Sequence, residues 1–194
     1  MKNLKNLNLK ITFNSPVILV FSLICLVALL IGGLTGGAVT QIFFSTYRYS
    51  LASPLTYLRF FTHIFGHSGW EHFFGNITYI LLLGPMLEEK YGSKMLIQVM
   101  VITAFATGLV NFILFPKVML CGASCVVFAF ILMTSFTEFK AGQIPVTFLL
   151  IALIFIGGQI IQAIFVKDDI ANLSHIIGGI IGAVIGYLAN RKKI

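Results

Sequence analysis

The stretch ANLSHIIGGIIGAVIGY, residues 171–187, carries a histidine and a glycine spacing that together decide how the helices of this chain pack. Gly178 and Gly182 follow His175 by three and seven residues, so the three residues share one face of a helix. Glycines four residues apart remove side chains from that face and let the backbone of another helix approach closely. We expect the other helix to be the one that starts at GASC, the segment that contains Ser124. This packing would bring His175 within reach of Ser124.

The composition indicates a membrane protein. Of the 194 residues, 58% are hydrophobic and only 10% are charged. A soluble domain of this size does not keep so many apolar residues with so few charges, so lipid is the expected solvent, and the length fits a single domain. The net charge of +7 lies mostly near the chain ends, which is typical of a membrane protein and argues against nucleic-acid binding. The terminal basic residues are Lys2, Lys5, Lys10, Arg191, Lys192 and Lys193.

Six apolar segments predict an all-α membrane protein, a bundle of six transmembrane helices. Each segment is close to the roughly 20 residues that a helix needs to cross a bilayer, although the second and fourth are short. The first is too long for the apolar part of a signal peptide, so we expect a retained span. We predict a membrane domain over residues 17–190, with basic cytoplasmic termini at 1–16 and 191–194. The apolar segments are residues 17–34, 72–87, 95–115, 122–136, 146–165 and 171–189.

The loop charges predict the orientation of this multi-pass protein in the membrane. Nine of the thirteen Lys and Arg residues lie in the termini and in the turns EEKYGSK and TEFKAG. By the positive-inside rule both termini face the cytoplasm, which places the starts of the second, fourth and sixth helices outside. The long first loop, residues 35–71, is rich in aromatic residues and contains Arg48 and Arg59. We therefore expect it to form a structured element in the headgroup region.

Polar side chains at membrane depth are costly, so they mark candidate functional groups. His72 and Asn76 are four residues apart and share a face of the second helix. Ser124 begins the fourth helix, His175 begins the sixth, and His67 precedes the second. These side chains all lie near the outer ends of helices two, four and six, so they are expected to share one depth.

Together these groups have the chemistry of a nucleophilic site. Ser124 lies at a helix N-terminus, where free N–H groups and the helix dipole favour negative charge. A serine that attacks a carbonyl needs a base to accept its proton and donors to hold the oxyanion. His175 could be the base, and His72, Asn76 and the backbone N–H of Ser124 could be the donors. The inner parts of the spans contain no Asp or Glu, so we expect a Ser–His dyad, with Phe128 stacked on the imidazole.

Each of these groups also has a plain structural explanation. A lone serine in a membrane helix usually packs or bonds to a carbonyl, a buried asparagine usually links helices, and Gly-xxx-Gly is common in spans that merely pack. His63, His67 and His72 have a spacing seen at metal sites, but the glutamate of an HExxH motif is absent. The three cysteines have the spacing of neither a disulfide framework nor a zinc site. No metal ion and no other cofactor is predicted.

Four stretches resemble the motifs of the rhomboid family of intramembrane serine proteases, and they occur in the same order. They are LRFFTHIFGHSGWEHFFGN, GPMLEEKYGS, GASC and ANLSHIIGGIIG. The resemblance covers the chain from about Leu55 to the C-terminus. It implies a six-helix bundle with a water-filled cavity that opens to the outside.

The resemblance also implies roles for individual residues. Ser124 would be the nucleophile of a GxSx motif that begins at Gly122. His175 would be the general base and acid, at the start of a pattern that continues with Gly178 and Gly182. Further matches are His72 and Asn76 as oxyanion-hole side chains, His67 as a structural histidine, Arg59 in the first-loop motif and Glu88 at the cytoplasmic end of the second helix.

The chain departs from the family pattern at three positions. Cys125 replaces the glycine that usually follows the serine, and its side chain could crowd the oxyanion hole. Phe128 keeps the ring but not the hydroxyl of the tyrosine that often packs on the histidine, and Leu58 replaces a tryptophan before Arg59. None of these differences removes a catalytic group.

The leading hypothesis is hydrolysis of peptide bonds in or next to the transmembrane segments of membrane proteins. The substrate would enter sideways, past the fifth helix and the loop with Lys167, Asp168 and Asp169. The alternative is a catalytically silent relative that binds transmembrane segments, although silent members typically lose the serine or the histidine. A transporter would predict ionisable residues at mid-bilayer or inverted repeats, and neither is apparent. The compact layout suggests a bacterial cytoplasmic membrane, and no oligomeric state is predicted.

Overall fold

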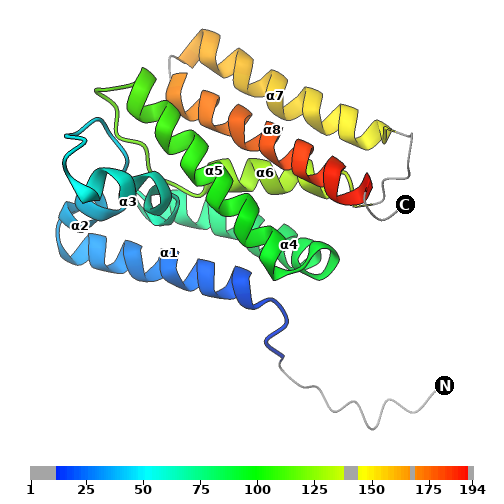
Figure 1. Ribbon diagram of the computed structural model, residues 1–194, viewed down its shortest axis with the longest axis horizontal. Coiled ribbons are helices and arrows are strands. Elements are labelled where there is room, and N and C mark those ends of the chain that lie inside the picture. The colour runs from blue at the N-terminus through cyan, green and yellow to red at the C-terminus, as the bar shows by residue number, and fades with distance from the viewer. Residues whose placement is uncertain (1–11, 138–143, 167–168, 192–194) are drawn as a thin grey trace.

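The computed structural model describes residues 12–137, 144–166 and 169–191, and the regular structure in these ranges is helical, which confirms the all-α class (Figure 1). The helices in chain order are α1 (Pro16–Leu34), α2 (Ala38–Phe43), α3 (Pro54–Thr62), the 3-10 helix η1 (His63–Phe65), α4 (Trp70–Tyr91), α5 (Ser93–Leu114), α6 (Ser124–Thr134), α7 (Val146–Val166) and α8 (Asp169–Arg191).

The six predicted apolar segments correspond to α1, α4, α5, α6, α7 and α8. Within the described residues, α1, α5 and the part of α8 from Ala171 to Arg191 are long and apolar enough to cross a membrane, so the count of six spans stays a prediction. The expected shortness of the fourth segment is confirmed, because α6 has 11 residues. The second apolar segment is shorter than α4, the helix that contains it, and within the described residues α4 is not among the helices long and apolar enough to cross a membrane. Helix α4 has 22 residues, because it continues past its apolar part through Glu88 and Lys90.

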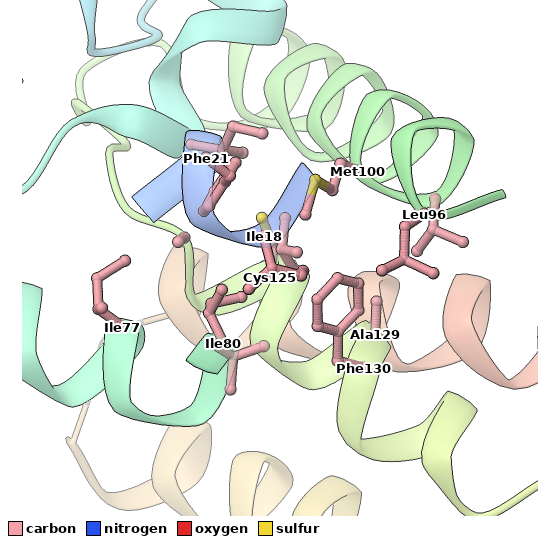
Figure 2. Close-up of a cluster of buried hydrophobic side chains, with 14 of the residues drawn as sticks. Ile18, Phe21, Ile77, Ile80, Leu96, Met100, Cys125, Ala129 and Phe130 are labelled. Atoms are coloured by element: carbon pink, nitrogen blue, oxygen red, sulfur yellow. The ribbon is translucent and has the colours of Figure 1, made fainter. Parts of the chain in front are cut away.

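Helix α6 lies at the centre of the bundle and packs against α4, α5 and α8. It is apolar on all sides, and eight of its 11 residues are buried, as a helix without a polar face requires. Figure 2 shows Cys125, Ala129 and Phe130 of α6 within this core. The surrounding side chains labelled there are Ile18 and Phe21 of α1, Ile77 and Ile80 of α4, and Leu96 and Met100 of α5.

Helices α6 and α8 approach each other backbone to backbone. A Cβ atom at Gly178 would lie 2.9 Å from the carbonyl carbon of Cys125, and one at Gly182 would lie 2.6 Å from that of Ala129. Real Cβ atoms essentially never come this close to other heavy atoms, so a side chain at either position would force the helices apart. The predicted packing of the Gly-xxx-Gly face against the helix that starts at GASC is therefore confirmed.

The long first loop folds into α2, α3 and η1, which confirms the expectation of a structured element. Arg59 of α3 is buried, and its Nε donates a hydrogen bond of 2.7 Å to the carbonyl of Ile42. Its guanidinium lies 4.4 Å from the ring centroid of Tyr47. An isolated β-bridge between Thr46 and Leu120 ties the loop to the segment that leads into α6. The loop therefore braces the start of α6, and its depth in the membrane stays a prediction.

The start of α1 and the end of α8 lie at one end of the bundle (Figure 1). The carboxylate of Glu88 in α4 accepts hydrogen bonds from the N–H groups of Val17 (3.2 Å) and Ile18 (3.3 Å) at the start of α1. Asn190 of α8 donates a 2.7 Å hydrogen bond to Oη of Tyr91, at the same end of α4. This agrees with termini on one side of the membrane, and their cytoplasmic location stays a prediction. The predictions on Lys2, Lys5, Lys10, Lys140, Lys167, Asp168, Lys192 and Lys193 fall outside the described residues.

Candidate active site

Ser124 is the first residue of α6, and the chain reaches it through a turn that favours glycine. Gly122 has a φ of 130°, a conformation that residues with side chains rarely adopt. Its N–H donates a 2.9 Å hydrogen bond to the carbonyl of His63, which fixes the turn to η1. Ala123, the residue before the helix, has no side chain that can cap it. The N–H group of Ser124, the first residue of α6, has no acceptor within the helix and is suited to bind an anion.

His175 lies in the second turn of α8, and its ring is stacked on that of Phe128 in α6. The two ring centroids are 4.3 Å apart and the ring planes differ by 3°. Phe128 follows Ser124 by four residues, so both belong to one face of α6, and the stack holds the imidazole against that face. The stacking agrees with the sequence expectation. His175 lies near the start of the sixth helix, as predicted, although α8 begins at Asp169, two residues before the predicted segment.

His72 and Asn76 of α4 reach the glycine turn before α6. A Cβ atom at Gly122 would lie 2.7 Å from Nε2 of His72 and 3.8 Å from Nδ2 of Asn76. The Nδ1 atom of His72 lies 3.1 Å from Oγ of Ser68, which orients the ring. Asn76 is only 6% exposed, and its Nδ2 has no hydrogen-bond partner in the described part of the chain. Buried amide donors are normally paired, so an unpaired one at this turn is suited to donate to a ligand.

The other two histidines of the HIFGH stretch are buried and neutral. His67 is 2% exposed, its Nδ1 lies 3.2 Å from the carbonyl oxygen of Phe65, and its ring centroid is 5.1 Å from that of His72. Burial, together with the neighbouring His72, lowers the pKa of His67 to about 4. His63 has its Nε2 3.0 Å from the carbonyl oxygen of Ala104, and complete burial lowers the pKa of His63 to about 4.

The histidines are not arranged as a metal site. His63 faces α5, whereas His67 faces His72, so their sequence spacing does not bring the three rings to one point. Among the residues that the structure describes, no group of three or more His, Cys, Asp or Glu side chains could hold a metal ion.

Cys125 has its side chain in the hydrophobic core (Figure 2). The residue is 2% exposed, and its Sγ accepts a 3.8 Å hydrogen bond from Oγ1 of Thr107 in α5. The expectation that this side chain could crowd the oxyanion hole does not agree with this position.

A cavity of about 880 Å³ lies beside His67, between the end of α1, α2 and the segment before α6. Ser68, Trp70 and Cys121 also contribute to its lining. Ser124 and His175 are not among its lining residues, so the water-filled cavity that the resemblance implies at Ser124 stays a prediction.

Two contacts of the site were not predicted from the sequence. Phe155 of α7 meets the ring of Phe128 edge-on, with 5.5 Å between centroids and 87° between planes. Ser68 bonds to His72, as described above. Phe155 is one of several phenylalanines in a mostly apolar helix, and Ser68 belongs to an irregular loop, so neither carries a periodic signal.

Arg59 and Glu88, which the resemblance singles out, belong to the scaffold around the site. Arg59 holds the first loop through its bond to Ile42. Glu88 holds the start of α1, and in α4 it lies roughly 24 Å along the helix axis from His72. The contacts of both side chains hold elements of the bundle together, so both act on its stability.

Known proteins match most of this chain. The Rhomboid domain family model matches residues 54–192, which include all the candidate site residues. Rhomboid-related protein 1 of Caenorhabditis elegans is 25% identical over 139 residues, which cover 67% of this chain and 39% of that protein. Rhomboid protease GlpG of Haemophilus influenzae is 24% identical over 137 residues, which cover 70% of this chain and 71% of that protein. With apolar helices of membrane-spanning length, this chain is an integral membrane protein, and it belongs to the rhomboid family.

Proposed function

We propose that this chain is a serine endopeptidase that hydrolyses peptide bonds in or next to the transmembrane segments of membrane proteins. Ser124 is the nucleophile, and His175 is the general base and acid. His72, Asn76 and the backbone N–H of Ser124 bind the oxyanion. The site lies near the outer face of a six-span domain, with both termini in the cytoplasm of a bacterial cell.

The ring stack between His175 and Phe128, at 4.3 Å and 3°, supports this proposal most directly. Phe128 is one helical turn from Ser124, so the stack holds the imidazole against the face of α6 that carries the hydroxyl. In a three-residue triad an aspartate orients the histidine. Here the flat contact with Phe128 restricts the ring, which allows a dyad to work without a buried carboxylate.

The acylation step follows from these roles. The Oγ of Ser124 attacks the carbonyl carbon of the scissile bond while its proton passes to the imidazole of His175. The negative charge of the tetrahedral intermediate is stabilised by the side chains of His72 and Asn76 and by the first N–H group of α6. His175 then donates its proton to the leaving amine, the C–N bond breaks, and an ester forms on Ser124.

The deacylation step regenerates the enzyme. His175 takes a proton from a water molecule, whose oxygen attacks the ester carbon, and the same donors hold the second oxyanion. Collapse of this intermediate releases the carboxylic acid, and the oxygen of Ser124 recovers its proton from the imidazole.

The substrate must present an extended backbone at the site. The carbonyl groups of a transmembrane helix are bonded within the helix, so the segment has to unwind before one of them can reach Ser124. Substrates with small residues near the cleaved bond and a weak helix suit this requirement. The substrate reaches the site sideways from the membrane, past α7.

Cleavage by purified, full-length protein in lipid vesicles tests the proposal, with a model transmembrane substrate. Ser124→Ala and His175→Ala should each lower the cleavage rate by at least about 10³-fold, because the two groups act as one unit. Ser135→Ala is the matched control, since the Oγ of Ser135 bonds to the carbonyl of Ile131 at the other end of α6.

The outcomes are distinct. Cleavage that survives Ser124→Ala would reject the serine assignment, and cleavage abolished by a chelator would favour a metal-dependent reaction. A wild-type protein that binds the substrate segment without cleaving it would favour the alternative of a silent binding protein.

A further inference from the structure

Helix α7 packs on α6 and α8 through a face that carries two phenylalanines. Phe148 and Phe155 are seven residues apart, about two turns, so their side chains leave the helix on the same side. Phe148 contacts the ring of Phe136, which follows α6, with 4.5 Å between centroids. Phe155 contacts the ring of Phe128 with 5.5 Å between centroids. Of these two contacts, the one made by Phe155 is with Phe128, the ring that also stacks on His175 of the candidate dyad.

Three rings from three helices form a continuous series at the site. Phe155 of α7 is perpendicular to Phe128 of α6 (87°), and Phe128 is parallel to His175 of α8 (3°). Edge-to-face and stacked arrangements are both favourable for aromatic pairs. Phe128 is only half-buried, so the core alone does not enclose its ring, and the two neighbouring rings define its plane. Without Phe155, rotation of Phe128 would be less restricted.

We propose that Phe155 is a positioning residue, which holds Phe128 in the plane that keeps the imidazole of His175 directed toward Ser124. This inference rests on the proposed function. It also links the position of α7 to the orientation of the base, because Phe155 moves with α7. The competing role for Phe155 is that of a simple barrier on the path of the substrate.

Two rates measured on purified full-length protein separate these roles. The first is the rate at which a small fluorophosphonate probe labels Ser124, which needs the base but not the sideways passage of a helix. The second is kcat, with KM, for a model transmembrane substrate. Phe155→Ala should lower both the labelling rate and kcat by roughly three- to ten-fold, the contribution of one aromatic pair, with KM unchanged.

The chain offers matched variants for this test. Phe155→Tyr keeps the ring and should keep both rates. Phe155→Leu keeps apolar volume without a ring and should behave like Phe155→Ala, which guards against a variant that fails to fold. Phe148→Ala removes the same ring type from the same face of α7 and should leave both rates within about twofold of wild type.

A double-mutant cycle tests whether Phe155 acts through Phe128. If it does, Phe155→Ala should have no further effect on the labelling rate in a Phe128→Ala background. Additive effects of the two substitutions would overturn the positioning role, because Phe155 would then act by another route.

Other results would also overturn the inference. Normal labelling of Phe155→Ala with faster cleavage of the transmembrane substrate would make Phe155 a barrier only. Equal losses in Phe155→Ala and Phe148→Ala would reduce its role to general packing of α7. A wild-type protein that is not labelled at Ser124 would overturn the proposed function itself, whereas an active wild type with an unaffected Phe155→Ala would overturn only the role of Phe155.

Discussion

Asn76 combines a buried position with an unpaired amide donor beside the glycine turn. A buried donor without a partner lowers stability by about 1–3 kcal/mol relative to a paired one. A donor that binds an oxyanion must be free in the resting enzyme, so function and stability set opposite requirements at this residue.

Replacement of Asn76 by leucine should therefore separate the two quantities. In Asn76→Leu, kcat should fall about 10²–10³-fold, because one oxyanion donor is lost. The midpoint of thermal unfolding should not fall, because no hydrogen bond of Nδ2 is removed. Asn190→Leu is the control with the opposite expectation, since it loses the 2.7 Å bond to Tyr91 at the far end of the bundle. Wild-type kcat in Asn76→Leu would contradict the oxyanion assignment.

The residue pairs that share a helix face could be predicted from spacing alone. His72 with Asn76, and Ser124 with Phe128, follow from four-residue intervals. The direction of the Cys125 thiol could not be predicted, because it depends on how α6 is rotated within the bundle. The same reason applies to the ring contact of Phe155, which depends on where α7 lies.

At the scale of elements, two adjacent glycines of α8 have different surroundings. A Cβ atom at Gly178 would lie 2.9 Å from the carbonyl carbon of Cys125, whereas one at Gly179 would lie 3.6 Å from Cγ of Leu132, an ordinary contact distance. The approach of α6 and α8 therefore depends on Gly178 and not on its neighbour.

This contrast predicts opposite effects of the same substitution. Gly178→Ala should lower the free energy of unfolding by about 1–3 kcal/mol, because the methyl group overpacks the contact with α6. Gly179→Ala should be neutral or stabilising by up to about 1 kcal/mol, because alanine favours a helix over glycine. Unfolding in mild detergent, followed by circular dichroism, measures both. Equal losses of unfolding free energy in the two variants would contradict the close contact of Gly178 with the backbone of α6.

The helices themselves could be predicted from apolar runs, and most of their ends lie within two residues of the prediction, but the end of α4 does not. The apolar run that marks α4 stops before Glu88, although the helix continues to Tyr91, because Glu88 is paired with the start of α1. The predicted start of the sixth segment, residue 171, lies two residues after the start of α8 at Asp169, because hydropathy does not mark polar turns at helix ends. Caps and polar contacts decide such boundaries, and they depend on neighbouring elements.

At the scale of the whole molecule, the fold keeps His63 neutral in a loop that joins the bundle. His63 lies in η1, outside the spanning helices, and burial lowers its pKa from the ordinary value of 6.5 to about 4. The unfolded chain therefore binds a proton more readily than the folded chain. The contribution of the buried, neutral His63 to the free energy of unfolding is therefore complete above about pH 6.5 and is lost as the pH falls toward 4.

The free energy of unfolding should accordingly fall by about 2 kcal/mol between pH 7.5 and pH 5 through His63 alone. His63→Gln keeps a donor for the carbonyl of Ala104 but does not titrate, so its unfolding free energy should change less over this range. Denaturant titrations at the two pH values compare the variants. If the two proteins have the same pH dependence, burial does not lower the pKa of His63 in the folded protein.

The sequence is sufficient to predict the all-α class, the six apolar segments and the pairing of α6 with α8. It is not sufficient for the path of the first loop, where α2, α3 and η1 are held by long-range contacts such as the bond from Arg59 to Ile42. Such contacts join residues that no local pattern relates.

In the proposed mechanism, the packing of α6 on α8 makes the hydroxyl of Ser124 reactive through the imidazole of His175. Treatment of the purified protein with a fluorophosphonate, followed by mass spectrometry of its peptides, tests this claim most directly. An adduct on Ser124 is expected in the wild-type protein, and its loss is expected in His175→Ala. An adduct on another residue, or labelling of Ser124 that does not depend on His175, would contradict it.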